Sequence, residues 1–102
     1  MLICAEGDNM GYLDLTGKGA IVTGAAGGLC LGMAEGLMEA GASVCIIDIN
    51  PGAEKTAQEM TDRGFQCSFV IADIADDKER EQAFSEAVKL LGGTLDIIVN
   101  GA

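Results

Sequence analysis

The stretch AIVTGAAGGLC at residues 20–30 decides the fold of this chain of 102 residues. Its first three residues form a short apolar run, which is typical of a buried strand, and Thr23-Gly24 ends that run. A glycine-rich loop follows, and from Leu29 onward apolar residues recur at helical spacing until Gly41, a residue type that commonly ends helices. The stretch therefore predicts a strand, a tight turn and a helix in direct succession. The apolar stripe of that helix is Leu29, Met33, Leu37 and Ala40.

The rest of the chain continues the alternation of strand and helix. Nearly continuous apolar runs at 43–48, 66–72 and 95–100 predict three more strands. Amphipathic patterns over 53–63 and 76–91 predict two more helices.

Local side-chain signals support both of these helices. In the first, Glu59 and Arg63 are four residues apart and can form an ion pair along the helix. In the second, Asp76 and Glu79 have the spacing of a capping box, in which each side chain accepts a hydrogen bond from the other residue's backbone N–H. Gly92-Gly93 then ends the second helix.

The order βαβαβαβ predicts an α/β fold. Strands that alternate with helices form a parallel sheet with right-handed crossovers, and continuous apolar runs are typical of strands covered on both faces. We therefore expect a Rossmann-like, doubly wound parallel sheet with strand order 3-2-1-4. Residues 15–102 would form this unit, as the N-terminal half of a larger domain, and residues 1–14 would be a frayed leader.

The composition limits the classes of partner. The chain has 16 Asp and Glu against six Lys and Arg, a formal charge of -10, and no basic run. A surface that binds a nucleic-acid backbone or an anionic membrane is therefore not expected. No apolar run reaches the length of a membrane span.

The counts of His and Cys limit the chemistry and the compartment. The chain has no His, which excludes His-based metal sites and His general bases. The four cysteines are widely separated and none forms C-x-x-C, so zinc-ribbon and thioredoxin-type motifs are absent. Cys45 and Cys67 fall in apolar runs, where a free thiol behaves as a small apolar side chain. These features favour a reducing cytoplasm, and no metal is predicted.

The first strand-to-helix turn carries the strongest chemical signal. Glycines there let the backbone turn tightly and let a phosphate approach closely, and the free N–H groups and the dipole of the helix favour an anion. Neither G-x-G-x-x-G nor G-x-x-x-x-G-K-[ST] is present, so the standard dinucleotide fingerprint and the P-loop are both unmatched. The residues favour a phosphate-binding turn, and a loop that merely reverses the chain is the alternative.

Asp48 ends the second expected strand, 20 residues after Gly28. A carboxylate at this place can accept hydrogen bonds from both hydroxyls of an adenosine ribose. It would repel a 2′-phosphate, and no Arg or Lys follows in residues 49–51 to neutralise one. The prediction is a preference for NAD over NADP, with a solvated or helix-capping Asp as the alternative.

Several motifs, in order and at the right spacing, resemble those of the classical short-chain dehydrogenase/reductase family. The motifs are Thr23-Gly24-x-x-x-Gly28, Asp48, Ala72-Asp73-Ile74 and Asn100-Gly101-Ala102. The resemblance runs from about Leu15 to the last residue, and residues 13–49 are most similar to sugar-acid and polyol members such as gluconate 5-dehydrogenase and 2-deoxy-D-gluconate 3-dehydrogenase. The family implies an oxidoreductase that acts on a carbonyl/alcohol pair with a nicotinamide dinucleotide.

The resemblance implies a role in cofactor binding for each of these positions. Thr23, Gly24 and Gly28 would form the pyrophosphate turn, with the backbone of Leu29 beside it. Asp48 would hold the adenosine ribose.

The two remaining motifs would line other parts of the cofactor. Asp73 and Ile74 would border the adenine, with an ordinary strand-end Asp as the alternative for Asp73. Asn100, Gly101 and Ala102 would correspond to the start of the family's N-N-A-G motif, whose second Asn is Gly101 here. A local turn or sheet contact is the alternative role of Asn100.

Cys30 departs from the family pattern T-G-x-x-x-G-x-G, because it replaces the last Gly. A thiol adds bulk in the first turn of the helix, and a helix N-terminus favours the thiolate, which would repel a pyrophosphate. We expect weakened cofactor binding. A tolerated neutral thiol and a redox switch at Cys30 are the alternatives.

A second departure concerns catalysis. The family uses Tyr-x-x-x-Lys with an upstream Ser, and the Tyr moves the proton at the substrate oxygen. The only Tyr here is Tyr12, which is followed four positions later by Thr16 instead of Lys. No catalytic residue is therefore assigned, and we expect no turnover by this chain alone. The nicotinamide side and the substrate pocket would belong to a longer protein.

Two functional interpretations follow from these motifs. The first is the NAD-binding N-terminal portion of a dehydrogenase whose small-molecule substrate, a sugar acid or similar polar compound, binds only to the longer protein. The second is a free-standing, non-catalytic nucleotide-binding or interaction module. A response-regulator receiver is disfavoured, because Thr23-Gly24 stands where an acidic pair is needed.

The last predicted strand, at 95–100, would lie at an edge of the sheet. With strand order 3-2-1-4 it pairs on one side only, and Ile97, Ile98 and Val99 would be bare. An apolar parallel edge invites association. We therefore expect the chain to be marginally stable, and to form a homo-oligomer or to aggregate.

Overall fold

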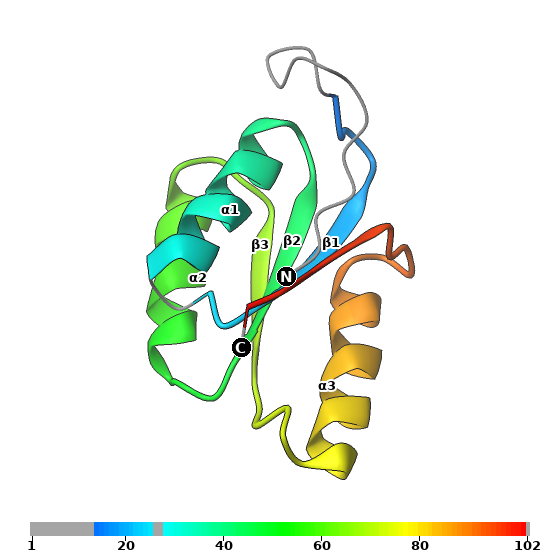
Figure 1. Cartoon of the computed structure of the whole chain (residues 1–102). Helices are drawn as coiled ribbons and strands as arrows, with labels where there is room; N and C mark the ends of the chain where they lie inside the picture. The colour runs from blue at the N-terminus through cyan, green and yellow to red at the C-terminus, as the bar shows by residue number, and fades with distance from the viewer. Residues whose placement is uncertain (1–13, 26–27, 102) are drawn as a thin grey trace.

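The computed structural model describes residues 14–25 and 28–101, and all structural statements below concern these residues. Four strands alternate with three helices in the order predicted (Figure 1). The strands are β1 (Gly19–Thr23), β2 (Ser43–Asp48), β3 (Cys67–Ile71) and β4 (Ile97–Asn100). The helices are α1 (Gly28–Glu39), α2 (Gly52–Asp62) and α3 (Asp77–Leu90).

The strands form one parallel sheet with the order β3-β2-β1-β4, which confirms the predicted doubly wound arrangement. β1 pairs with β2 on one side and with β4 on the other, so it is the central strand next to the point where the order reverses. Thr23, the last residue of β1, lies between Ile47 of β2 and Asn100 of β4 in the register. The carboxyl ends of these three strands therefore meet at one edge of the sheet.

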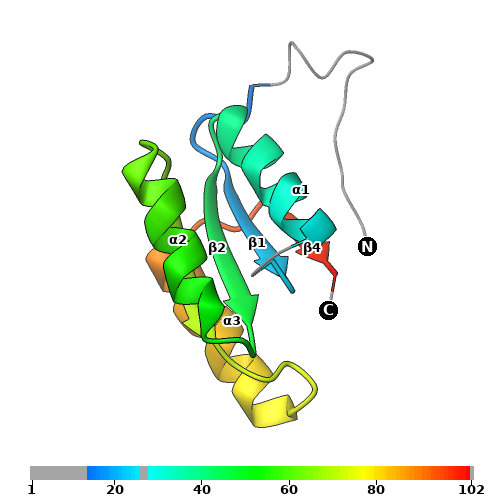
Figure 2. The same cartoon turned by 90° about the vertical axis from the view of Figure 1, so that its left-hand side faces the viewer.

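Side chains of β1 alternate between two separate cores, one on each face of the sheet. Ala20 and Val22 pack toward α1 and α2, whose buried residues include Leu37 and Met60. Ile21 packs on the opposite face toward α3. Figure 1 shows α1 and α2 on one side of the sheet and α3 on the other, and Figure 2 looks onto the face that α1 and α2 cover. Because both faces are covered, all five residues of β1 are buried.

The apolar stripe predicted for α1 is partly wrong. Leu29 is 73% exposed, and the residues that α1 buries are Ala34, Leu37 and Met38. Cys30, next to Leu29 in the first turn, does pack against this core. The buried face of α1 therefore runs through Cys30, Ala34, Leu37 and Met38, and at 3.6 residues per turn Leu29 lies to the side of that face.

The capping prediction for α3 is confirmed in one half only. The side chain of Asp76 accepts hydrogen bonds from the backbone N–H groups of Lys78 and Glu79 at 3.0 Å each, as an N-cap does. The Glu79 carboxylate does not return to Asp76: its Oε1 accepts from the N–H of Asp73 at 3.2 Å. The Asp76 N–H instead donates to the Asp73 carbonyl, so the turn before α3 satisfies it locally.

The predicted ion pair between Glu59 and Arg63 is replaced by a contact between helices. Arg63 is the C-cap residue of α2, and its guanidinium lies 3.3 Å from the carboxylate of Glu35 on α1 and over the ring of Phe65. Both charged side chains are substantially exposed, so this ion pair contributes about 0–1 kcal/mol.

The expectation of a bare β4 edge holds for one residue of three. Ile97 and Val99 are buried against the α1 face, whereas Ile98, on the opposite face, is 42% exposed. α3 covers mainly the β2–β3 side of that face, where most of its contacts with the sheet lie. The exposed apolar surface at this edge is therefore confined to Ile98 and the nearby Leu95.

Candidate functional site at the carboxyl edge of the sheet

The predicted site residues within the described part of the chain gather at the carboxyl edge of the sheet. Thr23 and Asn100 end β1 and β4, and Asp48 ends β2. Asp73 follows the end of β3 by two residues, and Gly28 begins α1. Parallel strands bring their carboxyl ends to the same edge, and ligands of such sheets bind there, beside the point where the strand order reverses.

The hydroxyl of Thr23 joins the ends of β1 and β4. Its Oγ1 donates to Oδ1 of Asn100 at 2.9 Å and accepts from the backbone N–H of Gly101 at 3.1 Å. Thr23 is almost fully buried, whereas Asn100 and Gly101 are exposed. Thr23 is thus the support beneath the site, and the alternative role of Asn100 as a sheet contact is observed. A ligand role for Asn100 remains a prediction.

The turn between β1 and α1 has open space beside Gly28. Gly24 and Gly28 have φ of 73° and 70°, which an L side chain rarely adopts, and the Gly24 N–H donates to the carbonyl of Ile47 at 2.9 Å. Apart from its chain neighbours and the backbone of its own helix, no described residue comes within 4 Å of the place where a Cβ on Gly28 would stand. The first turn of α1 contains no acidic residue. The open space beside Gly28 and the N–H groups of a helix start that carries no acidic side chain fit an anionic group such as a pyrophosphate.

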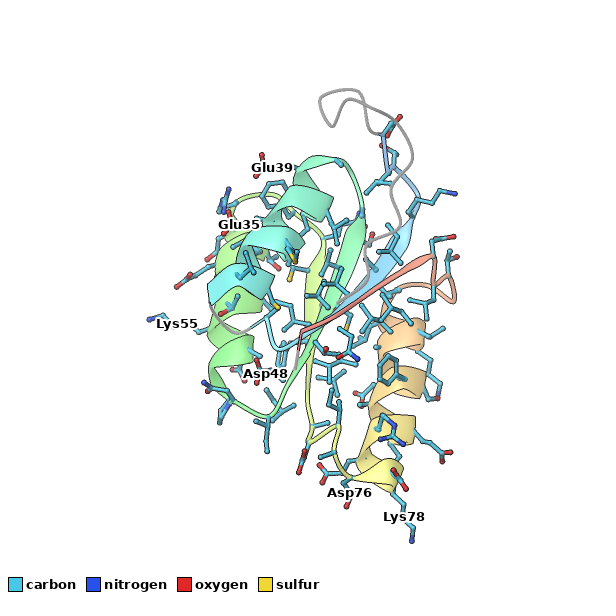
Figure 3. The ribbon with its side chains drawn as sticks, in the orientation of Figure 1. Glu35, Glu39, Asp48, Lys55, Asp76 and Lys78 are labelled. Carbon is cyan, nitrogen blue, oxygen red and sulfur yellow. The ribbon has the colours of Figure 1, made fainter. Side chains whose placement is uncertain are left out.

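Asp48 is half-buried at the end of β2 (Figure 3). One carboxylate oxygen accepts from the backbone N–H of Asn50 at 2.9 Å, and the Asn50 side chain in turn accepts from the N–H of Gly52 at the start of α2. Asn50 thus accepts the hydrogen bond from the first residue of α2, while Asp48 supports the turn that precedes it. The role of Asp48 toward a ribose remains a prediction. A carboxylate fixed by its turn is preorganised to accept further hydrogen bonds from a ribose.

Asp73 and Ile74 form the turn that leads from β3 to α3. The Asp73 carboxylate accepts from the N–H of Ala75 at 3.0 Å, which is the turn-forming role of an ordinary strand-end Asp. Ile74 is half-buried against the α3-side core, and its carbonyl accepts from Arg80 at 3.0 Å. These contacts give both residues a local structural role. Their place beside an adenine remains a prediction.

The cysteines that the structure describes, Cys30, Cys45 and Cys67, are free thiols. Burial raises the pKa of Cys45, and burial together with the neighbouring Cys45 raises the pKa of Cys67 to about 11. Both thiols are therefore neutral at physiological pH. Cys30 is half-buried in the first turn of α1, and its effect on cofactor binding remains a prediction.

Two residues discussed above, Ala102 and Tyr12, lie outside the described residues, so the predicted place of Ala102 is not tested. Sequence reasoning missed the contact between Cys30 and Gly101, because residues 71 positions apart share no local pattern. The described part of the chain contains no group of three His, Cys, Asp or Glu residues that could hold a metal, and no helix there is long and apolar enough to cross a membrane.

Three surface grooves lie away from the carboxyl edge. Two grooves of about 500 and 430 Å³ run along the outer side of β3, between α2 and α3, and share Thr61, Cys67, Ser68 and Leu90. A third of about 570 Å³ lies on the outer surface of α3. None of the predicted site residues lines them, so the candidate site is defined by strand ends and backbone groups and not by these grooves.

The chain matches the family model described as short chain dehydrogenase over residues 18–102. It is 41% identical over 88 residues to "Oxidoreductase UcpA" of Escherichia coli, a match that covers 86% of this chain and 33% of that protein. The chain thus spans about a third of the length of the curated relatives it matches.

Two solved structures are similar to the fold. A hydroxysteroid dehydrogenase from Escherichia coli has a TM-score of 0.82 and 36% identity, covering 90% of this chain and 38% of that one. A 3-ketoacyl-(acyl-carrier-protein) reductase from Brucella melitensis, complexed with NADH, has a TM-score of 0.75 and 36% identity, covering 83% of this chain and 34% of that one. Neither name supports the predicted likeness to sugar-acid and polyol members.

Proposed function

The chain belongs to the short-chain dehydrogenase family, and on this premise we propose that it is the NAD-binding portion of an oxidoreductase acting on a carbonyl/alcohol pair. The observation that carries the proposal is the convergence of the start of α1, the Asp48 carboxylate and the Thr23–Asn100 pair at one edge of the sheet. The NADH bound to the Brucella reductase supports a nicotinamide dinucleotide as the ligand. We expect this ligand, in a reducing cytoplasm, to be the chain's direct small-molecule partner.

The backbone of the first turn would hold the pyrophosphate. The N–H groups at the start of a helix lack intrahelical partners and carry the positive end of the dipole, so they bind an anion without a basic side chain. Gly28 leaves room for close approach, and Gly24 ties the turn to β2. When bound, the nicotinamide would accept or supply the hydride.

Asp48 would decide between NAD and NADP. Its carboxylate would accept hydrogen bonds from the hydroxyls of the adenosine ribose, and a 2′-phosphate there would face a like charge. No Lys or Arg occupies residues 49–51. Lys55, the first basic residue of α2, projects away from Asp48 (Figure 3). We therefore expect NAD to bind more tightly than NADP.

The substrate would bind elsewhere in a longer protein. The chain's only Tyr is Tyr12, with Thr16 in place of the Lys of Tyr-x-x-x-Lys, so no group here can move the proton at the substrate oxygen in the way the family does. We propose that the chain alone has no turnover, and that the full oxidoreductase acts on a polar carbonyl/alcohol pair such as that of a sugar acid.

Isothermal titration calorimetry with NAD, NADP and ADP-ribose tests this proposal. We expect NAD and ADP-ribose to bind with similar affinity, since both carry the pyrophosphate and the adenosine ribose, and NADP to bind more weakly. Asp48→Asn keeps the side-chain size and the acceptor for Asn50 N–H but removes the charge. The variant should bind NAD about tenfold more weakly, the effect of losing one charge-assisted hydrogen bond. The ratio between its affinities for NAD and NADP should fall by a similar factor.

A matched control separates the charge at the site from the net charge of the protein. Glu39→Gln at the far end of α1 also removes one negative charge, at an exposed position away from Asp48 (Figure 3). It should leave the affinity for NAD and the ratio of NAD to NADP unchanged. Equal binding of NAD and NADP by the unmodified chain, or no binding of either, would contradict the proposal.

A further inference from the structure

The first turn of α1 lies close to the end of β4 at Cys30 and Gly101. Cys30 lies in that turn, and Gly101 follows β4 directly. A Cβ built on Gly101 would overlap the Sγ atom of Cys30. It would also lie 3.4 Å from the Cβ of Cys30 and 3.2 Å from the carbonyl oxygen of Thr23. The sulfur therefore fills the space that a side chain at position 101 would need.

We propose that Cys30 and Gly101 form a size-matched pair, and that Cys30 is a positioning residue that sets how closely the first turn of α1 approaches the end of β4. These two residues are also the two places where the cofactor motifs depart from the family pattern, with Cys in place of Gly at position 30 and Gly in place of Asn at position 101. Relative to the family pattern, position 30 gains a side chain and position 101 loses one. The structure brings the two departures into contact although 71 positions separate them.

The surroundings prevent either residue from moving away freely. The Gly101 N–H donates to Oγ1 of Thr23 at 3.1 Å, and Thr23 itself is almost fully buried between β2 and β4. A movement of Gly101 away from the sulfur would lengthen this hydrogen bond. On the other side, Cys30 belongs to a regular helix that packs on the sheet through Ala34 and Leu37. A larger side chain at either position must therefore push α1 and β4 apart.

This displacement would act on the proposed cofactor site, and to that extent the inference rests on the proposed function. The N–H groups of the first turn of α1 are those expected to face the pyrophosphate, and Asn100 lies next to Gly101 on the opposing strand end. A shift of the helix start relative to β4 changes the distance between them. An anion held by several backbone donors is sensitive to such shifts.

A double-mutant cycle in the full chain tests the pair. Gly101→Ala should lower the melting temperature by about 5 °C or more, because overpacking a fixed contact is destabilising. In a Cys30→Ala background the same substitution should lower it by less than half as much. There the sulfur is gone, the Cβ–Cβ distance of 3.4 Å is an ordinary contact, and only the 3.2 Å approach to the Thr23 carbonyl remains.

Two control substitutions make the cycle specific. Cys30→Ser keeps an atom at the γ position, so it should not rescue Gly101→Ala as Cys30→Ala does. Gly28 has a positive φ, so Gly28→Ala should lower the melting temperature through backbone strain. Its Cβ would meet no described residue outside its own helix and chain neighbours, so this loss should be the same with Cys or Ala at position 30. Equal losses from Gly101→Ala in both backgrounds would overturn the pair. If Gly101→Ala shows no cooperative transition, a folded double variant supports the pair and an unfolded one overturns it.

Binding of ADP-ribose supplies the readout of positioning. Gly101→Ala should weaken the affinity by about tenfold, and Cys30→Ala should restore it to within about threefold of the unmodified chain. A purely structural contact would change the melting temperature and leave the affinity of the folded protein unchanged, which would overturn the positioning role. Coupled melting temperatures with no binding by any variant, the unmodified chain included, would support the pair and refute the proposed function.

Discussion

Replacing Thr23 by Val tests whether the hydroxyl of this residue holds the ends of β1 and β4 together. Val has nearly the same shape, so the substitution removes the hydroxyl and little else. Two hydrogen bonds are lost, the one to Asn100 at 2.9 Å and the one from Gly101 at 3.1 Å. Each contributes about 0.5–1.5 kcal/mol. Because Asn100 and Gly101 are exposed, water can replace part of both bonds, and we expect a net loss of about 1–2 kcal/mol.

Urea denaturation and amide hydrogen exchange measure the two parts of this prediction. The free energy of unfolding should fall by that amount, with a melting temperature lower by roughly 4–8 °C per kcal/mol. Exchange of the Gly101 amide should become faster in Thr23→Val, since its acceptor is gone. Thr23→Ser is the matched control: it loses a buried methyl group, at about 1 kcal/mol, but keeps the acceptor and should keep Gly101 protected.

Two outcomes would show that the Thr23 hydroxyl has no such role. If Thr23→Val changes the free energy of unfolding by less than about 0.5 kcal/mol and leaves Gly101 exchange unchanged, the hydroxyl does not support the strand ends. Equal exchange rates in the Val and Ser variants would lead to the same conclusion.

Three further predictions concern stability and association. Asp76→Ala removes the acceptor for two N–H groups at the start of α3 and should cost about 1 kcal/mol in urea denaturation, whereas Asp76→Asn, which still caps, should cost little; equal losses would refute the cap. Because the pKa of Cys67 is raised to about 11 from its usual 9.0, the stability its neutral thiol contributes is complete below pH 9 and is lost as the pH rises through 11; Cys67→Ser should flatten that decline in pH-dependent thermal melts, and an unchanged decline would count against it. Ile98 and Ile71 are each 42% exposed on opposite edges of the sheet, so Ile98→Thr but not Ile71→Thr should reduce association in analytical ultracentrifugation, and the reverse result would place the contact at β3.

The regular elements were predictable because each is encoded over a short range. The run at 43–48 coincides with β2, and the runs at 66–72 and 95–100 contain β3 and β4 with only their ends trimmed. Continuous apolar runs indicated strands covered on both faces, and the two cores confirm this. Alternation of strands and helices then left few topologies to consider.

The contacts that sequence reasoning missed depend on the packing of distant segments. Arg63 pairs with Glu35 because the end of α2 lies beside α1, which no spacing within α2 could reveal. Leu29 is exposed, whereas Cys30 beside it packs on the core, so the face of α1 that meets the sheet is turned away from Leu29. In a helix as apolar as α1, periodicity does not fix which of several possible stripes faces the sheet.

The candidate site also combines residues that the local sequence indicates with contacts that only the fold reveals. Asp48 and the glycine turn were found from their positions at strand ends. The support beneath them was not, because the Thr23 hydroxyl reaches Asn100 and Gly101 across the sheet and Cys30 meets Gly101 between a helix and a strand. One local signal did exist: the departures from the family pattern at positions 30 and 101 are complementary in size.

We propose that the carboxyl edge of this sheet binds a dinucleotide. Titration of the isotope-labelled chain with NAD, followed by amide chemical shifts, detects such binding residue by residue. We expect saturable shifts concentrated at Gly24, Gly28 to Cys30, and Asp48 to Asn50, with NADP shifting the same amides only at higher concentration. Shifts confined to the grooves along β3, or no saturable shift at the carboxyl edge, would contradict it.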